Sequence, residues 1–300
     1  MNILITGGTG LIGKSLVPKL QEHNHSVRLL TRKKSNIPSE YYWSPDEKFI
    51  DPNAFENLDV IIHLAGANIS QKWSEDYKRE LYASRIDTAY LLKEYCVKHQ
   101  VRLKSFISAS GINYYGTFTS DRILYERDGI IQSDFLAKLC EKWEQAADSF
   151  SEISNRVVCL RTAMVLARNG GAFPMLKKTV DLNIGAAIGS GKQWMNWIHI
   201  DDLVMMYVFA VENNKMEGNF NAVADQIPTN EQFMKLLATI SGKIFLPVNV
   251  PAFILKMTFG EMSTIILEGS RASNEKIKSL GFDFKFSLPE KTFEDLVKES

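Results

Sequence analysis

Cysteine is scarce in this chain of 300 residues, and its placement excludes several classes of protein. The three cysteines, Cys96, Cys140 and Cys159, are odd in number and far apart, and no Cys-x-x-Cys pair occurs. A disulfide framework or a zinc site built on cysteine pairs is therefore not expected. Free thiols are typical of a reducing compartment, so we expect a cytoplasmic protein without a metal.

Neither an excess of one charge nor a long apolar run is present. Thirty-five basic residues balance thirty-five acidic ones, which argues against nucleic acid or an anionic membrane as partner. The most apolar later run, from Ile244 to Leu255, is interrupted by Pro247 and Pro251. It is also shorter than the roughly 18 residues that a membrane span requires. Since an apolar strand pattern begins at Asn2, no signal peptide is expected.

The most informative stretch is a glycine-rich turn at residues 2–13. A short apolar strand pattern leads into Gly7, Gly10 and Gly13, with Leu11 and Ile12 between the last two glycines, and the apolar residues Ile12, Leu16 and Leu20 follow with helical spacing. A helix N-terminus presents unpaired N–H groups, and glycine lets a pyrophosphate approach them closely. In this strand–turn–helix setting the glycine spacing predicts a dinucleotide site. The alternative is a tight turn that binds nothing.

The tip of the second expected strand, residues 27–31, favours NADP over NAD. An NAD-binding fold usually carries an acidic residue there, which binds the ribose hydroxyls. Here Thr31 and Arg32 are followed by two lysines and no acid. A guanidinium can bind a 2′-phosphate through paired, charge-assisted hydrogen bonds. The alternative is a solvated basic loop.

The middle of the chain continues a β-α-β alternation. Residues 37–57, which contain three prolines, are expected to be irregular. A continuous apolar strand at 59–66 then ends in Leu64, Ala65 and Gly66, small enough to line the adenosine side of a dinucleotide. His63 within it is interpreted as a core histidine. On the helix expected at 75–99, Arg85 either contacts phosphate or ribose or lies on a solvated face.

Several further motifs resemble one known family. The chain resembles the extended short-chain dehydrogenases/reductases, and more narrowly their atypical branch labelled nucleoside-diphosphate-sugar epimerase-like. The matching stretches cover almost the whole chain: Gly7–Gly13, Leu64–Gly66, Ser84-Arg85, Ser108–Gly116, Trp143-Glu144, Arg161-Thr162, Gly189–Trp194, Trp197–Asp202 and Gly281-Phe282. The resemblance implies that Ser110, or second Ser108, hydrogen-bonds a reacting carbonyl and that Val165 contacts the cofactor.

The tyrosine and lysine four residues apart that this superfamily uses for proton transfer are missing. None of the ten tyrosines is followed by lysine at that spacing. Phe135 and Leu139 stand about where the pair belongs, and neither can donate a proton. Asp134, Tyr114 and Tyr115 are the nearest substitutes in the sequence. Trp194, Trp197 and His199, farther along, either wall a substrate cleft or pack in the core.

The expected fold is a doubly wound parallel α/β sheet of the Rossmann type with a smaller, mainly C-terminal lobe. Residues 1–165 and 195–235 are expected to form the NADP-binding domain, and residues 166–194 and 236–300 the substrate lobe. Two functions remain open. One is an NADP(H)-dependent oxidoreductase or epimerase-like enzyme acting on an unassigned small molecule. The other is a non-catalytic dinucleotide-binding sensor or partner-binding protein.

Overall fold

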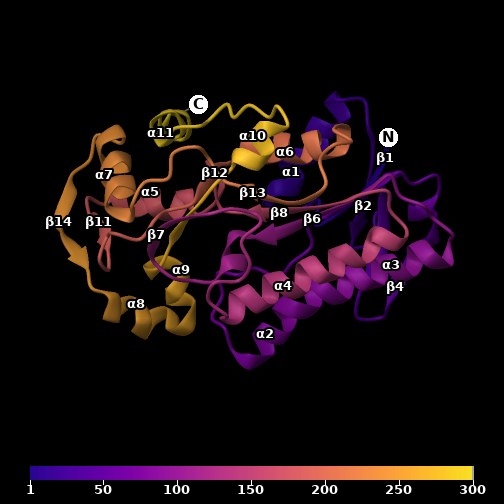
Figure 1. Cartoon of the computed structure of the whole chain (residues 1–300), viewed down its shortest axis with the longest axis horizontal. Coiled ribbons are helices and arrows are strands. Elements are labelled where there is room, and N and C mark those ends of the chain that lie inside the picture. Colours follow the sequence, from indigo (N-terminus) through magenta and orange to yellow (C-terminus); the bar gives the residue numbers. More distant parts are fainter. Residues whose placement is uncertain (299–300) are drawn as a thin grey trace.

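A parallel sheet of the Rossmann type forms the centre of the computed structural model, which describes residues 1–298 (Figure 1). Within this central sheet every strand pairs in parallel with its neighbour except β4, which is antiparallel to β3. The order across the sheet is β13 (Gly218–Ala222), β8 (Val157–Thr162), β6 (Ser105–Gly111), β5 (Val60–His63), β1 (Asn2–Thr6), β2 (Ser26–Thr31), β3 (Glu40–Ser44) and β4 (Phe49–Ile50).

Helices cover both faces of the sheet. On one face α1 (Leu11–Glu22) and α6 (Ile200–Glu212) share a core with Ile3 and Ile5 of β1. On the other face α3 (Thr88–Lys98) and α4 (Phe135–Asp148) share a second core with Leu4. Because successive side chains of a strand point to opposite faces, one apolar strand supplies both cores. The doubly wound parallel sheet predicted from the sequence is confirmed.

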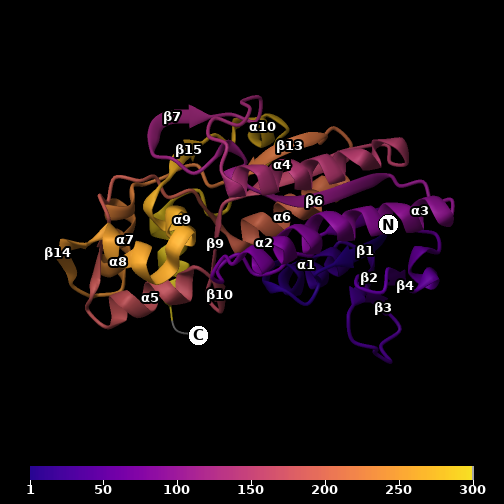
Figure 2. The ribbon, with the colours of Figure 1, turned by 90° about the horizontal axis from the view of Figure 1, so that it is seen from below.

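The helix expected at 75–99 is present but is not uniform. It consists of α2 (Glu75–Tyr82), a π-helical turn at Ala83–Asp87, and α3. Figure 2 shows this segment and α4 lying side by side across one face of the sheet. Single π-helical turns displace a side chain from the regular helical positions, and here the displaced region includes Arg85.

A smaller lobe lies beyond the carboxyl ends of the strands, on the left in Figure 1. Its strands are β9 (Met164–Ala167), β10 (Gly170–Gly171), β11 (Gly185–Ile188), β12 (Trp197–His199), β14 (Phe245–Val250) and β15 (Ser270–Ala272), and its helices are α5 (Phe173–Asp181), α7 (Asn230–Ile240), α8 (Ala252–Phe259), α9 (Thr264–Leu267) and α11 (Pro289–Val297). α10 (Glu275–Ser279) packs on the sheet domain instead, since its Ile277 joins the core shared by α1 and α6. β15 pairs with β7 (Ser120–Leu124), and Lys78 forms a 2.7 Å ion pair with Glu261, so the lobe is tied to the sheet domain.

One sequence expectation about regular structure was wrong. Residues 37–57 contain β3, β4 and a 3₁₀ turn at Pro52–Phe55, because Pro38 and Pro45 flank β3 without interrupting its hydrogen bonds. Near the C-terminus, Ile277 and Phe282 pack into the same core as α1 and α6. Among the described residues no helix has the length and apolarity needed to span a membrane.

Candidate functional site

The glycine-rich turn forms an open cradle at the start of α1. Gly10 is the residue that precedes the helix, and no side chain caps the N-terminal N–H groups. Gly7 has φ +70°, and a Cβ there would lie 2.8 Å from the Leu64 carbonyl, so glycine is required by conformation and by space. A Cβ on Gly13 would lie 2.5 Å from Gly8 Cα, whereas one on Gly10 would meet only the Gly7 carbonyl oxygen, at 3.2 Å.

These differences assign separate tasks to the glycines. Gly7 and Gly13 let the turn pack against β5 and against itself. Gly10 leaves the helix end open, together with the backbone N–H groups of Leu11 and Ile12 that follow it. An anion such as a pyrophosphate fits this end because the helix dipole and the free donors both favour negative charge.

The tip of β2 is basic and exposed, as the sequence predicts. Thr31 donates its hydroxyl proton to the Lys33 carbonyl at 2.8 Å, which closes a tight turn. Arg32 and Lys33 are exposed, and no carboxylate among residues 1–298 pairs with either. β2 lies beside β1, and Leu29 approaches the glycine turn at Gly8. Arg32 is therefore free to bind a negatively charged ligand that reaches from the turn past the end of β2.

The end of β5 is fixed beside the cradle by Thr6. Its hydroxyl accepts hydrogen bonds from the N–H groups of Leu64, at 3.2 Å, and Ala65, at 3.1 Å. Having accepted both, it donates to Nδ1 of His63 at 2.8 Å, and Nε2 of His63 donates to the Arg85 carbonyl at 2.9 Å. Complete burial lowers the pKa of His63 to about 4, so the ring is neutral. The interpretation of His63 as a core histidine is confirmed.

Arg85 underlies Gly66 and is buried, which excludes the solvated-face alternative. Its guanidinium donates to the carbonyls of Leu81, at 3.2 Å, and Ala67, at 2.9 Å, and lies 5.1 Å from the ring centre of Trp143. Burial lowers its pKa, and no carboxylate within residues 1–298 forms an ion pair with it. A Cβ on Gly66 would lie 2.9 Å from the guanidinium carbon, so the Arg85 side chain packs directly against the backbone at Gly66.

Ser110 does not point freely into a cleft. Its hydroxyl donates a 2.7 Å hydrogen bond to Oε1 of Glu144, and the residue is 3% exposed. Glu144 also receives two 2.8 Å hydrogen bonds from Nε and Nη2 of Arg161, a bidentate pair. Ser108, the second candidate, is completely buried and donates to the neighbouring Ala109 carbonyl.

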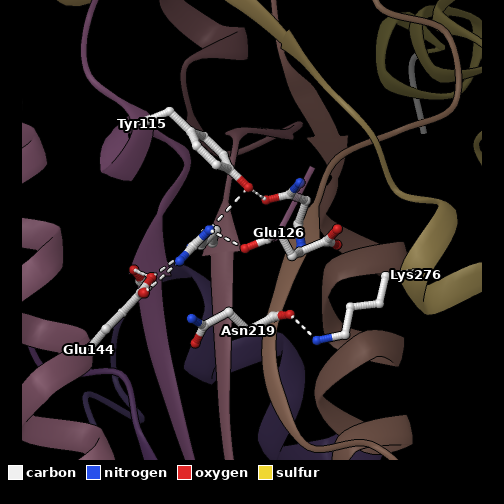
Figure 3. Close-up of polar contacts among 8 residues, drawn as sticks. Tyr115, Glu126, Glu144, Asn219 and Lys276 are labelled. Carbon is white, nitrogen blue, oxygen red and sulfur yellow. Dashed lines mark hydrogen bonds and ion pairs between the residues drawn. The ribbon is translucent and has the colours of Figure 1, made fainter. Parts of the chain in front are cut away.

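The Glu144–Arg161 pair extends into a buried polar network. Nη1 of Arg161 donates to the Tyr115 hydroxyl at 3.1 Å, and that hydroxyl donates to the side-chain oxygen of Asn221 at 2.9 Å. Figure 3 shows Tyr115 and Glu144 reaching the same guanidinium from opposite sides. Burial acts to lower the pKa of Arg161, but the hydrogen bonds and charge of Glu144 more than offset it and raise the pKa.

The three substitutes for the missing proton donor have structural contacts of their own. Asp134 caps α4, accepting from Ala137 N–H at 2.9 Å, and it also accepts from Thr117 N–H at 2.6 Å. Burial raises the pKa of Tyr115 to about 12, which opposes proton release near neutral pH. Tyr114 is half-buried and stacks on the Arg161 guanidinium at 3.5 Å, while burial raises its pKa as well.

The face of α4 that meets the end of β6 carries Cys140. A Cβ on Gly111, the residue after Ser110, would lie 3.0 Å from the Cys140 sulfur. Phe135 instead packs against the rings of Trp73, at 5.0 Å, and Tyr82, at 5.9 Å. Leu136, Cys140 and Glu144 are spaced four residues apart and so share one face of α4. Leu136 and Cys140 each follow directly after a member of the expected pair, Phe135 and Leu139. Burial raises the pKa of Cys140 to about 12, so this thiol is not ionised.

Val165 belongs to β9, which pairs with β10, and β10 contacts the glycine-rich turn at Leu11. Its carbonyl accepts from Ala172 N–H at 3.2 Å, and a Cβ on Gly170 would lie 2.5 Å from Cδ1 of Leu11. Val165, Leu11 and Leu64 all pack against the core between α1 and α6. The structure thus brings together the glycine turn, the end of β5 and Val165.

The three residues that were expected either to wall a substrate cleft or to pack in the core, Trp194, Trp197 and His199, differ in burial. Trp197 is fully buried and donates to the Gln226 carbonyl at 2.9 Å. His199 is buried, stacks on Phe286 at 3.8 Å and caps α6. Trp194 is half-buried and donates to Asp121 at 3.0 Å. Core packing is the correct alternative for Trp197 and His199.

Comparison with known proteins identifies relatives along the whole chain. The model of the NAD dependent epimerase/dehydratase family matches residues 3–222, and a domain of unknown function (DUF1731) matches residues 250–296. An epimerase family protein of Staphylococcus aureus is 33% identical over 302 residues, covering 99% of each chain. One from Staphylococcus epidermidis is 33% identical over 303 residues, covering 98% of each chain.

Solved structures agree with this assignment. Human epimerase family protein SDR39U1 (isoform 2), solved with NADPH, has 29% identity and a TM-score of 0.89, covering 99% of each chain. A nucleoside-diphosphate sugar epimerase of Corynebacterium glutamicum has 27% identity and a TM-score of 0.81, covering 99% of this chain and 58% of that one. With the family model matching most of its length and relatives matching all of it, this chain belongs to the NAD dependent epimerase/dehydratase family.

Proposed function

We propose that this protein binds NADP(H) at the carboxyl edge of the sheet and acts as an oxidoreductase or epimerase-like enzyme on a small-molecule substrate. The observation that carries the proposal is the uncapped, glycine-lined start of α1 beside an exposed basic β2 tip without an acid. The human relative solved with NADPH supports the choice of cofactor.

The cofactor would be held by residues from four strand ends. Gly7, Gly10, Leu11, Ile12 and Gly13 would receive the pyrophosphate, and Thr31 and Arg32 the 2′-phosphate. Leu64, Ala65 and Gly66 would line the adenosine side, with Arg85 fixing their backbone from below and Val165 facing the nicotinamide half. When bound, the nicotinamide supplies or accepts a hydride. Residues 1–165 and 195–235 would form this cofactor domain, and the lobe would supply the substrate contacts.

The role of Ser110 in this proposal depends on the Glu144 hydrogen bond. To orient a substrate carbonyl, its hydroxyl would have to rotate away from Glu144, because one proton cannot be donated twice. Glu144 would keep its two hydrogen bonds from Arg161 after such a rotation. The loss is then a single charge-assisted hydrogen bond, which a substrate oxygen can replace.

A second function, a non-catalytic NADP(H)-binding sensor, is favoured by one observation. Both the expected pair, Phe135 and Leu139, and the pair one residue further along α4, Leu136 and Cys140, lack a group that ionises near neutral pH. Neither pair therefore replaces the superfamily's usual proton donor.

Titration of the full-length protein with NADPH and NADH, followed by tryptophan fluorescence, tests the cofactor. Tighter NADPH binding is expected, and equal affinities would contradict it. Oxidation of NADPH over a broad panel of aldehydes, ketones and nucleotide-sugars then separates the two functions. Turnover of any member above the uncatalysed rate supports the enzyme, and binding without turnover supports the sensor.

A further inference from the structure

The outer end of the lobe carries an exposed apolar surface, which we call the β14–α8 surface. Six large apolar side chains make it up: Ile244 (66% exposed), Leu246 (36%), Val248 (74%), Phe253 (62%), Ile254 (44%) and Met257 (83%). α8 follows β14 after a single residue, Pro251, and both elements lie at the left-hand end of the molecule in Figure 1 and in Figure 2. Apolar side chains gathered in this way mark a site of interaction.

Packing within the chain does not account for this surface. Phe245 is the member of β14 that joins the core containing Phe233 and Leu237 of α7. α8 has the sequence Ala-Phe-Ile-Leu-Lys-Met-Thr-Phe, and none of its eight residues is buried. A short helix in water draws most of its stability from burying an apolar face, so this helix requires another surface to cover it.

The charges of this part of the chain are all of one sign. Thirty-five acidic residues occur in the chain, yet none falls in 232–260, where the only charged residues are Lys235, Lys243 and Lys256. Lys243 and Lys256 are exposed, and neither forms an ion pair with a carboxylate in residues 1–298. The even balance of charge over the whole chain, which argues against an anionic partner, therefore does not describe this surface.

We propose that the β14–α8 surface docks on the surface of an anionic lipid bilayer. Its apolar side chains enter the boundary between headgroups and acyl chains, and Lys243 and Lys256 contact the anionic headgroups. β14 is the outer strand of a two-stranded sheet, so the backbone groups on its outer side are unpaired and must remain hydrated. The contact is therefore confined to the bilayer surface.

Two other occupants fit the charges and the backbone less well. In a two-fold contact between two copies, the same lysines would face an acid-free surface, with no carboxylate from 232–260 to pair with them. An added strand of another protein would need a row of backbone donors along β14, which Pro247 interrupts. A lipid headgroup supplies the missing anion and requires no backbone pairing.

Flotation of the full-length protein with lipid vesicles tests the proposal, using phosphatidylcholine alone and an equal mixture of phosphatidylcholine and phosphatidylglycerol. The wild type should bind the mixed vesicles far more tightly, and added salt should weaken the binding. Val248→Asp/Met257→Asp should bind them at least about a hundredfold more weakly, because two apolar anchors are replaced by like charges. The control Ile123→Asp/Ile131→Asp, at apolar residues 41% and 45% exposed elsewhere, should bind as the wild type does.

A second pair of variants separates charge from apolar contact. Lys243→Gln/Lys256→Gln should lower the affinity for mixed vesicles about 25-fold, roughly fivefold for each lysine, and leave the affinity for phosphatidylcholine unchanged. The control Lys142→Gln/Lys215→Gln, at exposed lysines of the sheet domain, should retain wild-type affinity for both. Unchanged NADPH affinity and thermal unfolding establish that each variant is folded.

Hydrogen exchange locates the contact without any substitution. With mixed vesicles, exchange should slow in peptides covering 242–258 and stay constant in α3 and α4. The proposal is overturned by a wild type that does not bind mixed vesicles, by equal binding to both lipids, by binding that survives Val248→Asp/Met257→Asp, or by protection confined to α3 and α4. Sedimentation equilibrium without lipid identifies the competing occupant: self-association that the same variant abolishes, in a wild type that does not bind vesicles, would assign the surface to a second copy.

Discussion

Ser110 and Glu144 are joined by a 2.7 Å hydrogen bond in which the serine hydroxyl is the donor. Glu144 is 4% exposed, and its carboxylate also accepts hydrogen bonds from Nε and Nη2 of Arg161. The serine that family resemblance places at the reacting carbonyl is thus part of a buried ionic network. Its contribution to stability can be measured separately from any contribution to catalysis.

Replacing Glu144 should cost far more stability than replacing Ser110. Glu144→Gln leaves the Arg161 guanidinium buried without its counter-charge, which we expect to lower the free energy of unfolding by about 3–5 kcal/mol. Ser110→Ala removes one hydrogen bond to a charged group, a loss of about 1.5–3 kcal/mol. Urea unfolding at pH 7 measures both, with NADPH titration as a control for Ser110→Ala. If Glu144→Gln had the free energy of unfolding of the wild type, the Glu144–Arg161 ion pair would make no net contribution to stability.

Gly10→Val should prevent dinucleotide binding while leaving the fold intact. A Cβ at this position has a single close neighbour, the Gly7 carbonyl oxygen at 3.2 Å, so the valine would extend into the open cradle. We expect NADPH affinity to fall at least about a hundredfold because the pyrophosphate loses its approach to the helix N-terminus. Fluorescence titration measures this loss.

The matched control for this substitution is Gly129→Val, because a Cβ on Gly129 has no neighbour within 4 Å. It should retain both NADPH affinity and stability. Gly13→Val, in contrast, should destabilise the protein, since a Cβ there meets Gly8 at 2.5 Å. Wild-type affinity in Gly10→Val would place the dinucleotide elsewhere.

Arg32→Asp should change the choice of cofactor. The exposed guanidinium has no acidic partner among the described residues, so the substitution breaks no internal ion pair. NADPH affinity should fall roughly 30-fold or more through the loss of charge-assisted hydrogen bonds and the added repulsion of the 2′-phosphate. NADH affinity should stay constant or rise. Lys235→Asp, an equal charge change at an exposed position of α7, should alter neither affinity. A parallel loss of both cofactors would make Arg32 structural.

Much of the fold was predictable because its signals are local. The glycine spacing and the continuous apolar strands each lie within a few neighbouring residues, and each predicts one element of a Rossmann sheet. Proline misled the prediction for 37–57, since Pro38 and Pro45 can as well flank a strand as break one.

The buried network was not predictable because its members are distant in sequence. Ser110 meets Arg161 through the register of β6 on β8, and Glu144 meets both only because α4 turns that face towards the sheet. A sequence pattern shows that Glu144 lies among apolar residues on one helical face, but it does not name the partner. The same rotation of α4 decides that Cys140, and not Leu139, contacts the end of β6.

His63 should make stability depend on pH between 7 and 5. Its pKa of about 4 in the folded protein lies below the 6.5 of an unperturbed histidine, chiefly because of burial. The unfolded chain therefore binds more protons below pH 6.5, and the stabilisation is complete above that pH and is lost as the pH falls towards 4. The expected loss from this residue is about 2 kcal/mol between pH 7 and pH 5.

His63→Gln cannot titrate, so urea unfolding at the two pH values should show a smaller difference than in the wild type. His99→Gln, at an exposed histidine, should retain the wild-type difference. If His63→Gln retained the full difference as well, the buried ring would be charged in the folded protein, and the hydrogen bond from Thr6 to Nδ1 would have to run the other way.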